Sequence, residues 1–116
     1  MSEDTELIHI SMEQAKQKIA ISDALASLEN SEAFKLIFRD GYLRDYVARL
    51  ASLKASMAMA NDKDQAFLTR QIDAIGFFGQ YMGYIHAEAR VAREAIAADE
   101  LELQRIAEED SDGAIH

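Results

Sequence analysis

The stretch "LTRQIDAIGFFGQYMGYIHAEA", residues 68–89, places apolar, small or aromatic side chains at steps of three and four residues. This spacing is typical of one face of an α-helix and, when it is sustained, of a coiled coil. We call the residues on that face the seam: Leu68, Ile72, Ile75, Gly79, Met82, His86 and Ala89. The seam predicts a long C-terminal helix that packs along its length.

The limits of this helix follow from its flanks. Asn61 or Asp62 is a suitable N-cap, and the acidic residues after it suit the positive end of a helix dipole. The helical pattern then continues to about Glu109. At 1.5 Å per residue such a helix is roughly 70 Å long. The preceding chain is too short to cover it, so we expect self-association to complete the fold.

Three glycines leave an alternative open. Gly76, Gly79 and Gly83 lie within the predicted helix at steps of three and four. In the alternative interpretation, the helix bends at these glycines and folds back into a compact bundle. The glycines lack the strand and turn that surround a nucleotide-binding glycine motif, so we assign them to packing or kinking.

The rest of the chain is also predicted to be helical. Ser11 with Gln14 forms a capping-box pattern and opens a predicted helix over 11–29. Asn30 or Ser31 caps the next apolar run, which meets the pair Asp40-Gly41. Because Asp-Gly is a turn pair, we predict a break there rather than a kink, with a further helix that ends near residue 59.

Composition agrees with an all-α protein. Among 116 residues there is no proline and no cysteine, and strong helix formers fill the long segments. We predict one helical domain, 1–116, with tails at 1–10 and 111–116. It has three to four helices and a long C-terminal helix, arranged as a helical hairpin or bundle. The absence of cysteine excludes disulfides and thiolate metal sites, and no signal peptide or membrane span is predicted.

Charge is unevenly distributed along a chain of net charge −9. Residues 35–54 carry net +3 between acidic ends of −5 (1–32) and −6 (93–116). A candidate partner surface in this basic centre comprises Lys35, Arg39, Tyr42, Arg44, Tyr46 and Arg49. It could dock an anionic partner, with the tyrosines free to stack, or pair with acidic helices of the same or a neighbouring subunit. The overall charge favours pairing and disfavours nucleic acid as a partner.

Catalytic patterns are weak. His9, His86 and His116 are scattered, and no serine or threonine has a recognisable base partner in the sequence. His86 falls on the seam, where a satisfied or pH-sensitive interfacial histidine is the favoured interpretation. We therefore predict a protein that is not an enzyme, with no catalytic residue, metal or cofactor.

The order "ISMEQAKQKIAISDALASLENSEAFKLIFRDGYLRDYVARLASLKA", then "QIDAIGFFGQYMGYI" and an acidic tail, resembles a group of small helical proteins of tailed bacteriophages. The resemblance covers residues 10–109. It implies a viral setting, in the host cytoplasm or the virion, and transfers no residue role.

Two functions are compatible with these features of the sequence. The first is a phage structural or assembly protein that acts through self-association and contacts with another phage or host protein. The second is an acidic helical effector that binds and inhibits a host protein. A helical oligomer that binds a small ligand is kept as a third possibility.

Overall fold

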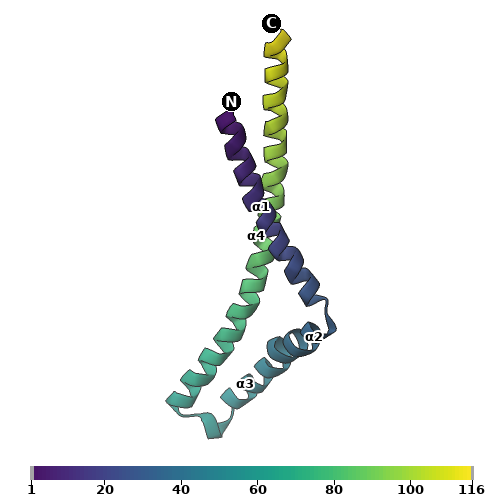
Figure 1. Ribbon diagram of the computed structural model, residues 1–116. Helices are drawn as coiled ribbons and strands as arrows, with labels where there is room; N and C mark the ends of the chain where they lie inside the picture. The colour runs from purple at the N-terminus through teal and green to yellow at the C-terminus, as the bar shows by residue number, and fades with distance from the viewer. Residues whose placement is uncertain (1, 116) are drawn as a thin grey trace. The chain divides into compact units, whose positions relative to one another are not determined.

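The computed structural model describes the backbone of residues 2–115 and the side chains of residues 3–111. The elements in chain order are α1 (Ser2–Glu29), α2 (Glu32–Phe34), the π-helix η1 (Lys35–Tyr46), α3 (Val47–Lys54), the 3-10 turn η2 (Met57–Met59) and α4 (Asp62–Ile115). Figure 1 shows these helices and the length of α4. No strand occurs within residues 2–115. The prediction of an all-α fold with a long C-terminal helix is confirmed.

Both predicted tails are largely helical. Helix α1 begins at Ser2 instead of residue 11, and α4 continues to Ile115 instead of ending near residue 109. Glu3 and Asp4 lie in the first turn of α1, where negative charge suits the helix dipole. The capping-box pattern at Ser11 lies inside the helix, so it does not mark a start. The predicted start of the first helix and the predicted end of the last helix were therefore wrong, because residues 2–10 and 111–115 are helical.

Contacts divide the chain into two compact units. Unit 1 comprises Met1–Asp23 and Ile85–His116, and unit 2 comprises Ala24–Tyr84. Helices α1 and α4 each contribute to both units. The prediction of a single domain stays a prediction.

In unit 1, the first part of α1 packs antiparallel against the last part of α4. Ser22 meets His86, while Lys18 meets Glu88, so the sequence numbers run in opposite directions along the pair. The buried residues here are mostly small: Met12, Ala15, Ser22, Ala89, Ala92 and Ile106. Short side chains allow the two backbones to approach closely.

In unit 2, η1 and α3 form an antiparallel hairpin with the first part of α4. Leu50, Leu68 and Ile75 form its buried cluster. Partly buried residues pack around that cluster: Tyr42, Leu43, Val47, Leu53, Met59 and Ile72. Large side chains therefore fill this interface.

Polar groups fix the connection between α3 and α4. The Gln65 amide Nε2 donates to the backbone oxygens of Lys54 (2.8 Å) and Met59 (2.9 Å). Asn61 Oδ1 accepts from the backbone N–H of Asp64 at 2.9 Å, which confirms the predicted cap of the long helix. These bonds satisfy carbonyls and amides that helix ends leave without partners.

The predicted break at Asp40-Gly41 was wrong. The chain is helical without interruption from Glu32 to Lys54, and no glycine among the described residues has a positive φ. Ser31 caps this run, because its Oγ accepts from the backbone N–H of Phe34 at 3.1 Å. Tertiary packing of Tyr42 and its neighbours on the buried cluster outweighs the local turn preference of Asp-Gly.

Helix α4 is also unbroken at its glycines. Gly76, Gly79 and Gly83 lie within the single helix Asp62–Ile115, so the alternative in which that helix folds back was wrong. A Cβ built at any of the three would meet no atom within 4 Å. Close packing within the chain therefore does not explain these glycines, and the prediction that they pack against another backbone stays a prediction.

Candidate interaction surface

The seam packs against the chain itself. Leu68, Ile75 and Ala89 are buried, and Ile72, Gly79, Met82 and His86 are partly buried. From the length of this helix we expected that the earlier helices would not cover all of it. In the structure α1, η1 and α3 supply side chains opposite the seam. The predicted role of the seam in self-association is not supported by these contacts.

The basic centre forms its ion pairs locally. Arg39 Nε lies 2.8 Å from Asp40, Arg44 Nε lies 2.9 Å from Asp45, and Arg44 also approaches Asp40 at 3.6 Å. Lys35 pairs with Glu32 at 3.6 Å. The acids are thus neighbours on the same helical run, whereas the sequence-based interpretation looked to the acidic ends of the chain.

These pairs favour the charged forms of their members. The hydrogen bond from Arg39 lowers the pKa of Asp40, while Asp40 raises the pKa of Arg39. A hydrogen bond to Asp45 raises the pKa of Arg44. All of these groups lie at the surface, where solvent screens the interaction and such pairs contribute little to stability.

An aromatic ladder follows η1. Phe34, Phe38, Tyr42 and Tyr46 recur every four residues, and neighbouring rings lie 5.2, 6.4 and 6.2 Å apart between centroids. Phe78 of α4 inserts beside it, 5.5 Å from Phe38 and 5.6 Å from Tyr42. Tyr42 and Tyr46, predicted to be available for a partner, stack on each other, and Tyr46 remains 42% exposed.

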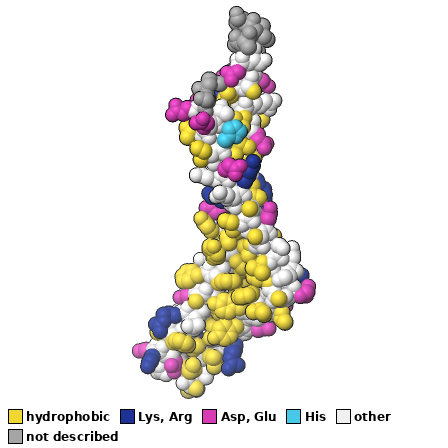
Figure 2. Space-filling model, in the orientation of Figure 1, with side chains coloured by type: hydrophobic (Ala, Val, Ile, Leu, Met, Phe, Trp, Pro, Cys, Tyr) yellow, Lys and Arg dark blue, Asp and Glu magenta, His cyan; other side chains and the backbone are white. Residues whose placement is uncertain are grey.

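Large apolar side chains remain exposed on several helices. On η1 these are Leu36, Ile37 and Tyr46, and on α1 they include Leu7, Ile10, Ile21 and Leu28. Figure 2 shows hydrophobic side chains gathered over the η1, α3 and α4 part of the molecule. Contiguous exposed apolar surface on a small protein indicates an interaction site.

Helix α4 carries a second row of mostly aromatic side chains, on a different face from the seam. We call it the outer stripe: Phe67, Arg70, Ala74, Phe77, Tyr81 and Tyr84, at alternating steps of three and four residues. The exposed fractions of its aromatic residues are 50% for Phe67, 65% for Phe77, 61% for Tyr81 and 58% for Tyr84. The same spacing test could have found this row, because it repeats the seam's period on another face of the helix.

Unit 1 brings together a serine and a histidine that the sequence did not connect. Ser22 Oγ and His86 Nδ1 lie 2.7 Å apart, although the residues are 64 positions apart in the chain. The interpretation of His86 as a satisfied histidine is confirmed, and the statement that no serine has a base partner is corrected. Ser22 is only 4% exposed and lies inside a helix, so a substrate has no access to its hydroxyl.

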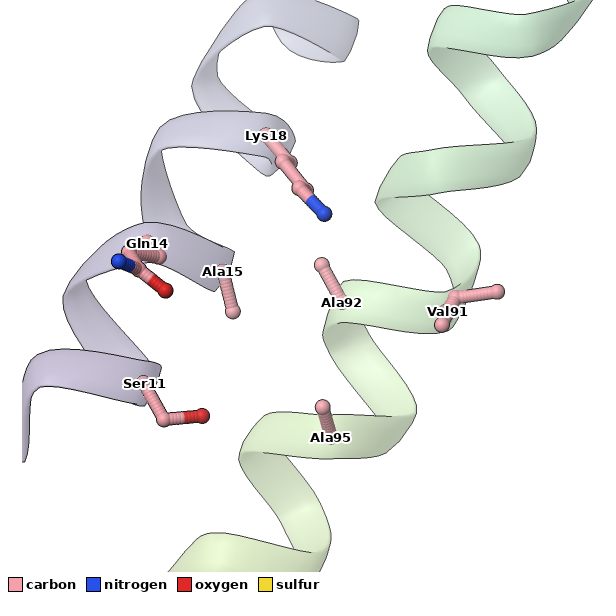
Figure 3. Close-up of a pocket in the computed structure, with 7 residues that line it drawn as sticks. All are labelled: Ser11, Gln14, Ala15, Lys18, Val91, Ala92 and Ala95. Carbon is pink, nitrogen blue, oxygen red and sulfur yellow. The ribbon is translucent and has the colours of Figure 1, made fainter. Parts of the chain in front are cut away.

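A small cavity opens beside this contact between α1 and α4. It measures about 140 Å³ and is lined by Ser11, Gln14, Ala15, Lys18, Val91, Ala92 and Ala95. Figure 3 shows the polar side chains on α1 and the short alanines on α4. The Lys18 ammonium pairs with Glu88 at 3.2 Å. The alanines leave this hollow because they are too short to fill the space between the helices.

Two kinds of feature are missing from the part of the chain that the structure describes: a cluster of metal-ligating side chains and a membrane-spanning helix. No group of three or more histidine, cysteine, aspartate or glutamate side chains is arranged to hold a metal ion there. Within the same residues no helix is both long enough and apolar enough to cross a membrane.

Comparison of the chain with protein-family models, with curated proteins and with solved structures found no match.

Proposed function

We propose that this protein is a non-enzymatic structural or assembly protein that acts through helix–helix self-association and contacts with other proteins. The observation that carries the proposal is the set of large apolar side chains exposed on its helices. Leaving such rows in water forfeits about 25 cal/mol for each Å² that a partner would cover. A partner helix is the simplest structure that covers a row with helical spacing.

The setting of this function rests on the resemblance to small helical proteins of tailed bacteriophages. Under this proposal the protein works in the phage particle or in the cytoplasm of the infected host. Its partners are further copies of itself and another phage or host protein. A net charge of −9 with acidic ends supports a second candidate, an acidic effector that binds and inhibits a host protein.

Light scattering over a range of micromolar concentrations tests the first candidate. We expect a mass above the 13.0 kDa of one chain that falls on dilution. A single-chain mass at every concentration would refute self-association. Abundance in purified particles then separates an assembly protein from an effector, because an effector is absent from them.

A further inference from the structure

We infer that the outer stripe is the surface for a second copy of this chain, and that two α4 helices pair there in antiparallel orientation. This inference rests on the proposed function, because it specifies which face self-associates. The outer stripe lies wholly within unit 2, between Phe67 and Tyr84. It does not use the seam, whose residues pack within the chain.

Spacing gives the first argument. Phe67, Ala74 and Tyr81 are seven residues apart, and so are Arg70, Phe77 and Tyr84. Two such rows separated by three and four residues form the contact face of a two-stranded coiled coil. The aromatic members are at least half exposed, so the face is open to another helix.

The order of the side chains decides the orientation. Antiparallel pairing about a midpoint between Ile75 and Gly76 puts residues whose numbers sum to 151 opposite each other. The opposing pairs are then Phe67 with the partner's Tyr84, Arg70 with the partner's Tyr81, and Ala74 with the partner's Phe77. Ala74, the small residue of the stripe, therefore faces a large ring, as a well-packed interface requires.

Charge gives an independent argument for the same orientation. Arg70 is the one charged residue of the outer stripe. Parallel pairing would place Arg70 against the partner's Arg70, where like charges repel, and Ala74 against the partner's Ala74, where a gap results. Antiparallel pairing places the guanidinium over a tyrosine ring, which is a favourable cation–π arrangement.

The area suits a weak but specific dimer. A buried aromatic side chain covers ~150–250 Å², so the exposed parts of the four rings supply roughly 350–580 Å² per chain. Two chains together bury roughly 700–1,150 Å² through the rings. Ala74, Arg70 and their neighbours bring the total to the ~1,000 Å² that separates a specific interface from an incidental contact.

Charge substitution on the outer stripe tests its use. Phe77→Glu and Tyr81→Glu should each raise the dimer dissociation constant about 30-fold, the ratio that corresponds to ~2 kcal/mol for a central interface residue. Leu101→Glu is the matched control, because Leu101 is equally exposed on the same helix but lies off the stripe. The helical circular dichroism of all three variants should match that of the unaltered chain.

Cross-linking tests the orientation, and the chain suits it because it contains no cysteine. In the antiparallel dimer Ala74→Cys brings two thiols within about 5 Å along the helix axes, whereas Lys63→Cys separates them by about 38 Å. A short bifunctional maleimide should therefore link Ala74→Cys and not Lys63→Cys.

Three results would contradict the inference, and they differ in what they say of the proposed function. Linking of Lys63→Cys would show a parallel pair. Self-association that is unaffected by Phe77→Glu and Tyr81→Glu would move the contact to another face. Both of these leave the proposed assembly function standing. A single-chain mass for the unaltered protein would refute both.

Discussion

The two units solve the same packing problem with different side chains. Each holds an antiparallel pair of helices that includes part of α4. In unit 1 the most deeply buried residue is Ala89, at 0% exposure, and the small residues Ala15, Ser22 and Ala92 are buried in the same unit together with Met12 and Ile106. In unit 2 the most deeply buried residue is Leu68, at 1% exposure, and leucine, isoleucine and aromatic side chains pack around it.

This difference sets how each unit is stabilised. A buried leucine or isoleucine contributes about 1.5–3 kcal/mol through the hydrophobic effect, whereas an alanine contributes far less. Unit 1 adds polar links between its helices: Lys18 to Glu88 at 3.2 Å, Asp23 to Arg93 at 3.7 Å, and Ser22 to His86 at 2.7 Å. We therefore expect unit 2 to be sensitive to lost volume and unit 1 to added volume.

The largest effect is expected from Leu68→Ala in unit 2. Removing this buried side chain leaves a cavity, and we expect the free energy of unfolding to fall by about 2–5 kcal/mol in urea denaturation. Leu36→Ala is the matched control in the same unit, because the Leu36 side chain is exposed, and it should change stability by less than about 0.5 kcal/mol. Equal losses for the two variants would contradict the position of the core.

The opposite change should disturb unit 1. Ala89→Leu adds volume where two helices are in close contact, and we expect a loss of about 1–3 kcal/mol from overpacking. Ala98→Leu makes the same change at an exposed position of α4 and should be nearly neutral. Tolerance of leucine at residue 89 in thermal melts would show that the helices of unit 1 do not approach closely there.

Replacement of two glycines by alanine compares a regular α-helix with the π-helix η1 within unit 2. Gly76 lies in regular α-helix with open space around it, so Gly76→Ala should raise the free energy of unfolding by about 0.5–1 kcal/mol. Gly41 lies in η1, where an added Cβ would be 3.1 Å from the backbone oxygen of Leu36. We expect Gly41→Ala to gain less than Gly76→Ala, or to lose stability, because the carbonyl must move. Equal stabilisation in thermal melts would contradict the π-helical geometry at Gly41.

The sequence predicted those parts of the fold that depend on local pattern. Helical spacing identified the long helix and the buried face that contains Leu68 and Ile75, and side-chain chemistry identified Asn61 and Ser31 as cap candidates. The break at Gly41 was wrong because a turn preference of one dipeptide is weak against the packing of its neighbours. A π-helix has no recognised local signature, so η1 could not be predicted.

The candidate surface was predictable in part. The outer stripe has the same period as the seam and could have been read as a second face. The pair of Ser22 and His86 depends on the antiparallel register of two distant segments, which one sequence does not specify. The partners of Arg39 and Arg44 are adjacent acids, Asp40 and Asp45, and were visible in the sequence. The prediction had paired these arginines with the acidic ends of the chain, which lie farther away in the sequence.

The smallest effect on stability is expected from the ion pairs of the basic centre. Their contribution depends on pH, which distinguishes it from the effects of the core and glycine substitutions. Hydrogen bonding by Arg39 lowers the pKa of Asp40 in the folded protein below its ordinary value of 3.8. A carboxylate with a lowered folded pKa adds stability above its unfolded pKa and loses that contribution as pH falls through the folded value. The unaltered chain should therefore lose slightly more stability than Asp40→Asn when the pH is lowered from 5 towards 3. The difference should shrink in salt, because the pair is exposed and screened.

Titration of the Asp40 carboxyl by NMR gives the direct measurement, and Arg39→Gln should return its pKa towards 3.8. A pKa of Asp40 at or above that value in the unaltered protein would contradict the pairing with Arg39 and reopen the basic centre as a surface for an anionic partner.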